Sequence, residues 1–255
     1  MRAKITPILA AATLAAMACT SAPTPSPEQA ATPPGSEGVL VVPLNLALRV
    51  PSELQDVDEP VWHELLRHFQ AQDRHVTMVA PVDAELLWMD TMAELEQPGA
   101  TLDLPTASAH FARRLAEHTD YGLLLMPSLV LRSARIHGRH AYWDGVRRRL
   151  HVRATPMHGP IIEIGLPGNH PGVWGLSGRV SAASLHVALL SSDGRFLYQG
   201  LAGLDLLQEA SLAGRAPSET WQLALREAPF TDVEAVRQGI ALAFERELPR
   251  TAYSW

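Results

Sequence analysis

The chain has 255 residues, of which 47% are apolar and 19% are charged, a composition typical of a globular protein. Its formal net charge of −6 argues against a general nucleic-acid binder. Cys19 is the only cysteine, which excludes an internal disulfide and a cysteine-rich zinc site. Lys4 is the only lysine, so the chain after residue 4 has no lysine for a phosphate-binding loop or a Schiff base. We therefore expect no cofactor.

Residues 1–18 have the pattern of a bacterial signal peptide. Arg2 and Lys4 precede an apolar stretch over residues 5–17, which is shorter than the ~20 residues that a membrane-spanning helix needs. The stretch runs into Ala16-Met17-Ala18-Cys19. This segment resembles the lipobox of bacterial lipoproteins, in which a peptidase cuts before the cysteine and the cysteine is lipidated. The alternative is an ordinary signal peptide, cut after Ala18, that leaves a free thiol.

The resemblance to a lipobox also implies a location. In Gram-negative lipoproteins, a residue other than aspartate after the lipidated cysteine implies sorting to the outer membrane, and here that residue is Thr20. Residues 19–38 contain five prolines and predict an extended tether that reaches at most ~60 Å, at ~3.1 Å per residue. Residues 39–255 contain no second linker and are expected to form a single domain facing the periplasm.

The first half of this domain alternates between strand and helix patterns. Buried strands are expected over residues 39–44 and 75–80, and helices from Pro60, over 82–96 and over 107–118. Leu86, Met89 and Ala93 fall on one side of the second helix. Phe111 and Leu115 are expected to face the core from the third helix.

In the second half the apolar period changes to that of strands. The run from Tyr121 to Ile136 begins apolar and becomes polar, and turns at 143–145 and 192–194 predict hairpins that join residues 129–142 to 146–154 and 180–191 to 195–204. Thr231 to Glu234 is typical of a capping box, and Pro249 is expected to end the helix that follows it. A stripe along that helix is made of Val233, Val236, Ile240 and Phe244.

These elements predict an α/β (α+β) fold with a single mixed β-sheet flanked by helices. A βαβα start is followed by antiparallel hairpins and a C-terminal helix. A long irregular stretch, residues 156–178, contains ten glycines or prolines, and loops of this length are often functional.

Positive charge is concentrated in one region. Between residues 132 and 158 the net charge is +6, whereas the rest of the chain after residue 18 carries −14. The arginines concerned are Arg132, Arg135, Arg139, Arg147, Arg148, Arg149 and Arg153. Arginine binds carboxylates and phosphates through two parallel hydrogen bonds, so this region is a candidate site for an anion or a partner. The alternative is a solvated surface whose arginines pair with the protein's own acids.

In a bacterial envelope the available anions are lipid A phosphates, phospholipid headgroups, peptidoglycan carboxylates and acidic proteins. Five of the eleven histidines lie between residues 137 and 170, and His137 and His140 could meet across a hairpin and bind a divalent metal. No Gly-x-Ser-x-Gly motif is present, and no catalytic residue is assigned. A binding protein is favoured over an enzyme, and a periplasmic hydrolase or metal-binding protein that uses residues 132–170 is the main alternative. A structural lipoprotein without a specific ligand is a third interpretation.

Over residues 39–248 the chain resembles proteobacterial envelope lipoproteins with a domain like the N-terminal domain of TolB, a group that includes CsgG-like and LpoB-like proteins. Three segments carry the resemblance: Val39–Leu44, Tyr121–Pro127, and Ser184–Leu204 with its turn at Asp193-Gly194. It implies an α/β domain and a non-enzymatic binding or assembly role at the outer membrane. The partners implied are the membrane, through Cys19, and an envelope protein or peptidoglycan.

Overall fold

The structure, a computed structural model, describes residues 38–55, 58–72, 74–96, 103–154, 177–213 and 220–248. The chain divides into two units, residues 1–35 and 36–255, and all described residues belong to the second. The expected signal peptide, Cys19 and the tether up to residue 37 lie outside the described residues, and so does most of the irregular stretch at 156–178. None of the described helices is long and apolar enough to cross a membrane.

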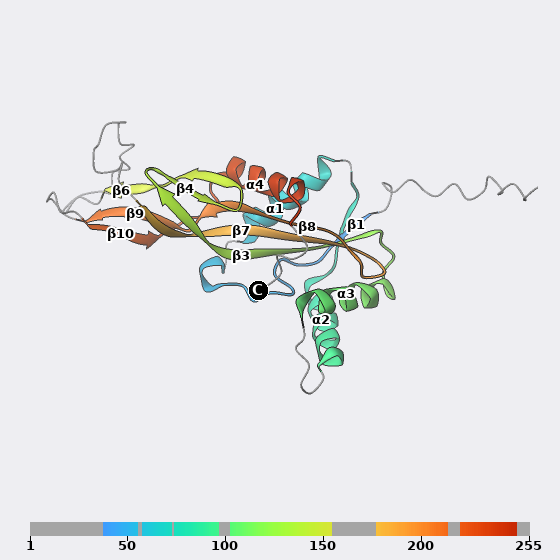
Figure 1. The fold of residues 1–255 in the computed structure, drawn as a ribbon. Helices are drawn as coiled ribbons and strands as arrows, with labels where there is room; N and C mark the ends of the chain where they lie inside the picture. Colours follow the sequence, from blue (N-terminus) through green and yellow to red (C-terminus); the bar gives the residue numbers. More distant parts are fainter. Residues whose placement is uncertain are drawn as a thin grey trace, which may run out of the picture. The chain divides into compact units, whose positions relative to one another are not determined.

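A mixed sheet of seven strands forms the centre of the second unit (Figure 1). Its strands are β1 (Val39–Val41), β2 (Val76–Met78), β3 (Leu123–His137), β4 (His140–Trp143), β5 (Val146–Arg149), β7 (Ser177–Ser191) and β8 (Phe196–Leu206). β1 pairs in parallel with β2 and β3, and the other pairs are antiparallel. A smaller, unpredicted sheet has the order β10 (Thr220–Leu225), β9 (Gln208–Ala213), β6 (Val152–Ala154).

Helices pack on both faces of the main sheet. They are α1 (Asp58–Gln70), α2 (Pro81–Leu95), α3 (Leu104–Ala116) and α4 (Val233–Glu245), and a short 3-10 turn spans Ser52–Leu54. α1 and α4 lie on one side of the strands and α2 and α3 on the other (Figure 1). This arrangement confirms the predicted α/β class with a mixed sheet flanked by helices.

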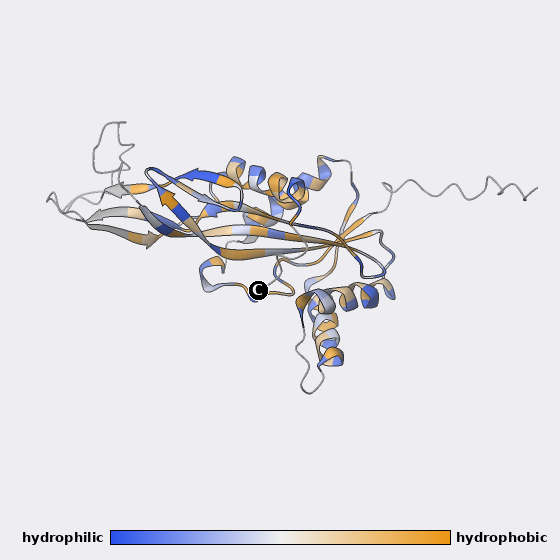
Figure 2. Ribbon diagram, viewed as in Figure 1, coloured by the Kyte–Doolittle hydropathy of each residue, from blue (hydrophilic) through white to orange (hydrophobic). Residues whose placement is uncertain are grey.

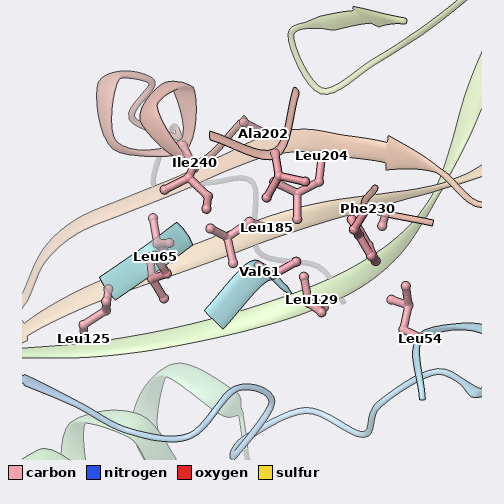
Figure 3. Packing of buried hydrophobic residues seen from close by; sticks show 14 of the residues in the cluster. Leu54, Val61, Leu65, Leu125, Leu129, Leu185, Ala202, Leu204, Phe230 and Ile240 are labelled. Atoms are coloured by element: carbon pink, nitrogen blue, oxygen red, sulfur yellow. The ribbon is translucent and has the colours of Figure 1, made fainter. Parts of the chain in front are cut away.

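Alternate residues of the buried strands belong to two separate hydrophobic cores, one on each face of the main sheet. Val41 and Leu125 face α1 and α4, whereas Val42 and Leu124 face α3. Side chains from β3, β7, β8, α1 and α4 converge in the first core, which Figure 3 shows around Leu185. Because a strand's side chains point alternately to opposite faces, a continuous apolar run is what a strand covered on both faces requires.

β3 and β7 form the long axis of the sheet. Each has fifteen residues, and they pair along their whole length, from Leu123 opposite Ser191 to His137 opposite Ser177. On its other edge, β3 pairs with β1 at its beginning and with β4 at its end. One half of β3 therefore lies in the helix-covered part of the sheet, and the other half joins the hairpin formed by β4 and β5.

The predicted turns are present, with one addition. Asp144 and Gly145 connect β4 to β5, and both have positive φ, +36° and +84°, as a tight two-residue hairpin turn requires. The strand expected over 129–142 is interrupted by a second tight turn at Gly138-Arg139, where Gly138 has φ +60°. The region is therefore a three-stranded meander rather than one hairpin.

Two further expectations are corrected. The strand expected to be buried over residues 75–80 is β2, and its residues Thr77 and Met78 are exposed because β2 is the edge of the sheet. The N-cap of α4 is Asp232 rather than Thr231: its carboxylate accepts a hydrogen bond from the Ala235 amide at 3.0 Å. Val236 and Ile240 reach the core as predicted, whereas Val233 is exposed. Pro249 lies outside the described residues.

Candidate anion-binding face

Four neighbouring strands align arginine side chains in rows across the sheet. The register places Arg179 of β7 opposite Arg135 of β3, Arg135 opposite Tyr142 of β4, and Tyr142 opposite Arg147 of β5. In the adjacent row His137 lies opposite His140, and His140 lies opposite Arg149. Residues two apart on a strand share a face. We call this set the arginine face: Arg135, His137, His140, Tyr142, Arg147, Arg149 and Arg179.

The opposite face of the same strands is buried and holds them in place. Ala134, Ile136, Ala141 and Trp143 belong to an apolar cluster, and Trp143 Nε1 donates a hydrogen bond to the Ala183 carbonyl at 3.2 Å. Gly203 of β8 permits this approach, because a Cβ there would lie 2.6 Å from Trp143 Nε1. Because one face of these strands is packed in the apolar cluster, the backbone that carries the exposed arginines is held rigidly. A rigid backbone lowers the entropy lost when the arginines bind a ligand.

The arginine face holds its cations close together. Arg147 Nη2 lies 3.0 Å from His140 Nε2, and the guanidinium carbon of Arg147 lies 5.9 Å from the centre of the Tyr142 ring. Burial, followed by the positive charges of Arg147, Arg149 and Arg139, lowers the pKa of His140 below its usual value of 6.5. The lowered pKa favours the neutral ring of His140, and a neutral ring can accept a hydrogen bond from Arg147.

Among the residues that the structure describes, no carboxylate offsets these cations. Within the described part of the chain, Arg135, Arg147, Arg149 and Arg179 form no ion pair with an acid. With strands ~4.8 Å apart and alternate residues ~6.8 Å apart, the two rows span roughly 14 Å by 7 Å. A surface of this kind can bind carboxylates or phosphates presented by a polymer or another protein. Figure 2 shows β5, the strand at the edge of the arginine face beside β4, as mainly hydrophilic.

Two of the predicted arginines are engaged elsewhere. Arg132 forms a two-pronged ion pair with Asp144, at 2.9 and 3.2 Å, and Ser184 Oγ donates to the same carboxylate at 2.7 Å. Arg148 donates from Nη2 to the Ala235 carbonyl of α4 at 2.7 Å. Both residues stabilise the meander rather than presenting a free charge.

The remaining sequence candidates have other positions. Arg139 lies in the turn between β3 and β4, and the side chain of Arg153 lies outside the described residues. Arg179 was not predicted, because only the pairing of β7 with β3 places it beside Arg135. His137 and His140 do meet across the turn, as the metal-binding alternative requires. The described residues contain no group of three or more histidine, cysteine or acidic side chains that could hold a metal ion.

Arg148 and its neighbour Arg149 should differ sharply in their effect on stability. Arg148→Ala removes a charged hydrogen bond to α4 and should lower the free energy of unfolding by about 1–3 kcal/mol. Arg149→Ala changes an exposed side chain and should alter the same quantity by less than about 0.5 kcal/mol. Urea denaturation of the two variants tests this contrast. Equal stability losses would show that the contact between Arg148 and Ala235 is not maintained in solution.

Comparison with protein-family models, curated proteins and solved structures finds no match to this chain.

Proposed function

We propose that this protein is a lipid-anchored, non-enzymatic binding module of the cell envelope, and that its arginine face binds an anionic partner. The observation that carries the proposal is the pair of cross-strand rows in which four arginines and two histidines share one face, with no acid among the described residues forming an ion pair with these arginines. The negative charge of the rest of the chain directs an acidic partner toward this one region.

The anchor part of the proposal rests on the N-terminal sequence. Cys19 follows Ala16-Met17-Ala18 in a lipobox-like segment, and the proline-rich residues 20–38 supply a tether. Two or three acyl chains on Cys19 hold a protein stably on a membrane, since each buried methylene contributes ~0.8 kcal/mol. We place the anchor in the outer membrane and the domain in the periplasm, where a carboxylate-rich wall polymer and acidic proteins are within reach.

Direct binding to two carboxylate-bearing probes tests the role of the arginine face. The protein is incubated with purified peptidoglycan sacculi, or with poly-glutamate, over a range of salt concentrations. Arg147→Gln combined with Arg149→Gln should weaken binding about tenfold or more and flatten its salt dependence, because charged hydrogen bonds of ~1.5–3 kcal/mol are lost. Binding to sacculi alone would identify the wall polymer as the partner, and binding to poly-glutamate alone would identify an acidic protein.

A matched control separates a specific face from general charge. Arg49→Gln combined with Arg113→Gln removes the same charge from two exposed arginines elsewhere and should leave binding unchanged. The His140 ring resonances provide a second readout: a bound anion offsets the surrounding guanidinium charges and should raise the pKa of His140. Unchanged binding of the Arg147/Arg149 double variant at low salt would overturn the role of this face.

A further inference from the structure

We propose that the exposed side of α2 is a docking surface for a basic amphipathic helix of another protein. This surface goes beyond the proposed function, because it involves neither the arginine face nor an anionic ligand. Its apolar residues are Val82, Leu86, Met89 and Ala93, which we call the α2 stripe. The first three are 66%, 56% and 65% exposed, and Ala93 is exposed as well.

α2 has two apolar sides, and the structure uses only one of them. Ala84 and Thr91 are buried, and Trp88 packs edge-to-face on Phe111 of α3 with ring centres 5.5 Å apart. At 100° per residue, the α2 stripe lies within an arc of about 60° on the opposite side of the helix. Exposed apolar residues that cluster on one side of a helix and are rimmed by polar side chains are typical of an interaction site.

The spacing of the α2 stripe indicates a helical occupant. Its four residues follow one another at intervals of four, three and four positions, which is the spacing of the a and d positions in a coiled-coil seam. They cover a length of ~16 Å, about two heptads. Figure 2 shows apolar residues along α2. A partner helix with the same spacing can therefore lay its own apolar ridge along this side.

Charge determines which kind of helix fits. Asp83 and Asp90 flank the stripe on one side and Glu85 on the other, at the positions that pair across a coiled coil. All three are exposed, and within the described residues none forms an ion pair. α2 contains no basic residue. A helix with lysine or arginine beside its apolar ridge therefore complements the stripe in both hydrophobicity and charge.

The same charges disfavour the two other occupants of an exposed apolar stripe. A second copy that packed α2 against α2 would bring like charges together at every flanking position, which destabilises such a pair. An anionic lipid surface would be repelled by the same three carboxylates, whereas membrane-binding amphipathic helices carry basic residues on their polar side. The occupant that remains is a basic helix of a different protein.

Two designed peptides test the proposal. One is an 18-residue helix with leucine at a and d and lysine at the flanking positions, and the other replaces each lysine by glutamate. The lysine peptide should bind the protein in a salt-dependent manner, and the glutamate peptide should not. Leu86→Gln combined with Met89→Gln should weaken binding about tenfold or more. Asp83→Asn combined with Asp90→Asn should weaken it and flatten its salt dependence.

The control is an apolar pair on another element. Leu223→Gln combined with Leu225→Gln alters two exposed leucines of β10 and should leave peptide binding unchanged. Circular dichroism of each variant confirms that the fold persists. Equal binding of the two peptides, or binding unaffected by Leu86→Gln with Met89→Gln, would overturn the proposal. So would stripe-dependent dimerisation in sedimentation, or stripe-dependent binding to vesicles of anionic phospholipid. None of these results bears on the arginine face, whose test uses other residues and other probes.

Discussion

Acidification from pH 7 to about pH 4 should remove about 3 kcal/mol from the free energy of unfolding through His186 alone. His186 lies on β7, opposite Ser128 of β3 and Leu201 of β8, and is only 7% exposed. Burial lowers the pKa of His186 to about 4, whereas the ordinary value of 6.5 applies to the unfolded chain. Between these two values the unfolded chain binds a proton that the folded protein excludes. The contribution is therefore fully present above pH 6.5 and is lost as the pH falls toward 4.

Carboxylates also titrate between pH 7 and pH 4, so the contribution of His186 to the free energy of unfolding is isolated by comparing variants. Urea denaturation of the wild type and of His186→Gln is measured at pH 7 and at pH 4.5. His186→Gln should reduce the loss of stability between these two conditions by about 2 kcal/mol or more. His118→Gln, which changes an exposed histidine, should retain the wild-type loss. A His186→Gln variant that loses as much stability as the wild type would show that His186 becomes protonated without unfolding.

The sequence predicted the elements of this fold because their signals are local. The apolar run after Tyr121 indicated the start of β3, and Asp193-Gly194 indicated the turn between β7 and β8. The turn at Gly138-Arg139 was missed because it lies among polar residues, where the alternation of apolar and polar side chains does not change. Strand partners depend on contacts distant in the sequence, so the long pairing of β3 with β7 could not be read from either segment.

The candidate site was predictable only as a region. Charge asymmetry identified residues 132–158, but neither charge nor composition distinguishes Arg148 from Arg149. Arg148 points toward α4 and Arg149 toward the arginine face, because adjacent residues of a strand point to opposite sides of the sheet. Arg179 joined the site through register, which no local pattern encodes.

The orientation of α2 depends equally on tertiary packing. Leu87 and Trp88 face α3 and the sheet, while Leu86 and Met89 face solvent, and the amino-acid pattern contains both sides. Periodicity alone would assign either side to the core. The exposed stripe therefore becomes informative only when the packed side has been identified.

Asp205→Ala should be the most destabilising of the substitutions considered, with a loss of about 3–5 kcal/mol in the free energy of unfolding. The Asp205 side chain of β8 is 7% exposed and that of its partner Arg226 is 9% exposed. Arg226 Nη1 donates to Asp205 Oδ2 at 2.8 Å, and the Phe230 amide donates to the same oxygen at 2.7 Å. Without the carboxylate, a buried guanidinium loses its counter-charge and a buried N–H loses its acceptor.

The Asp205→Ala substitution should also destabilise the hydrophobic core beneath α4. Phe230 is buried in the core that α1 and α4 share, and it has φ +61°, a left-handed conformation that is uncommon for a large side chain. The bond from its amide to Asp205 helps to hold this conformation. The effect of charge is separated from that of the amide by adding Arg226→Met, which removes the unpaired cation. The double variant should recover part of the stability lost in Asp205→Ala, as measured by a double-mutant cycle in urea. If Asp205→Ala costs less than about 1 kcal/mol, the guanidinium of Arg226 reaches water in the variant and the ion pair does not hold this segment.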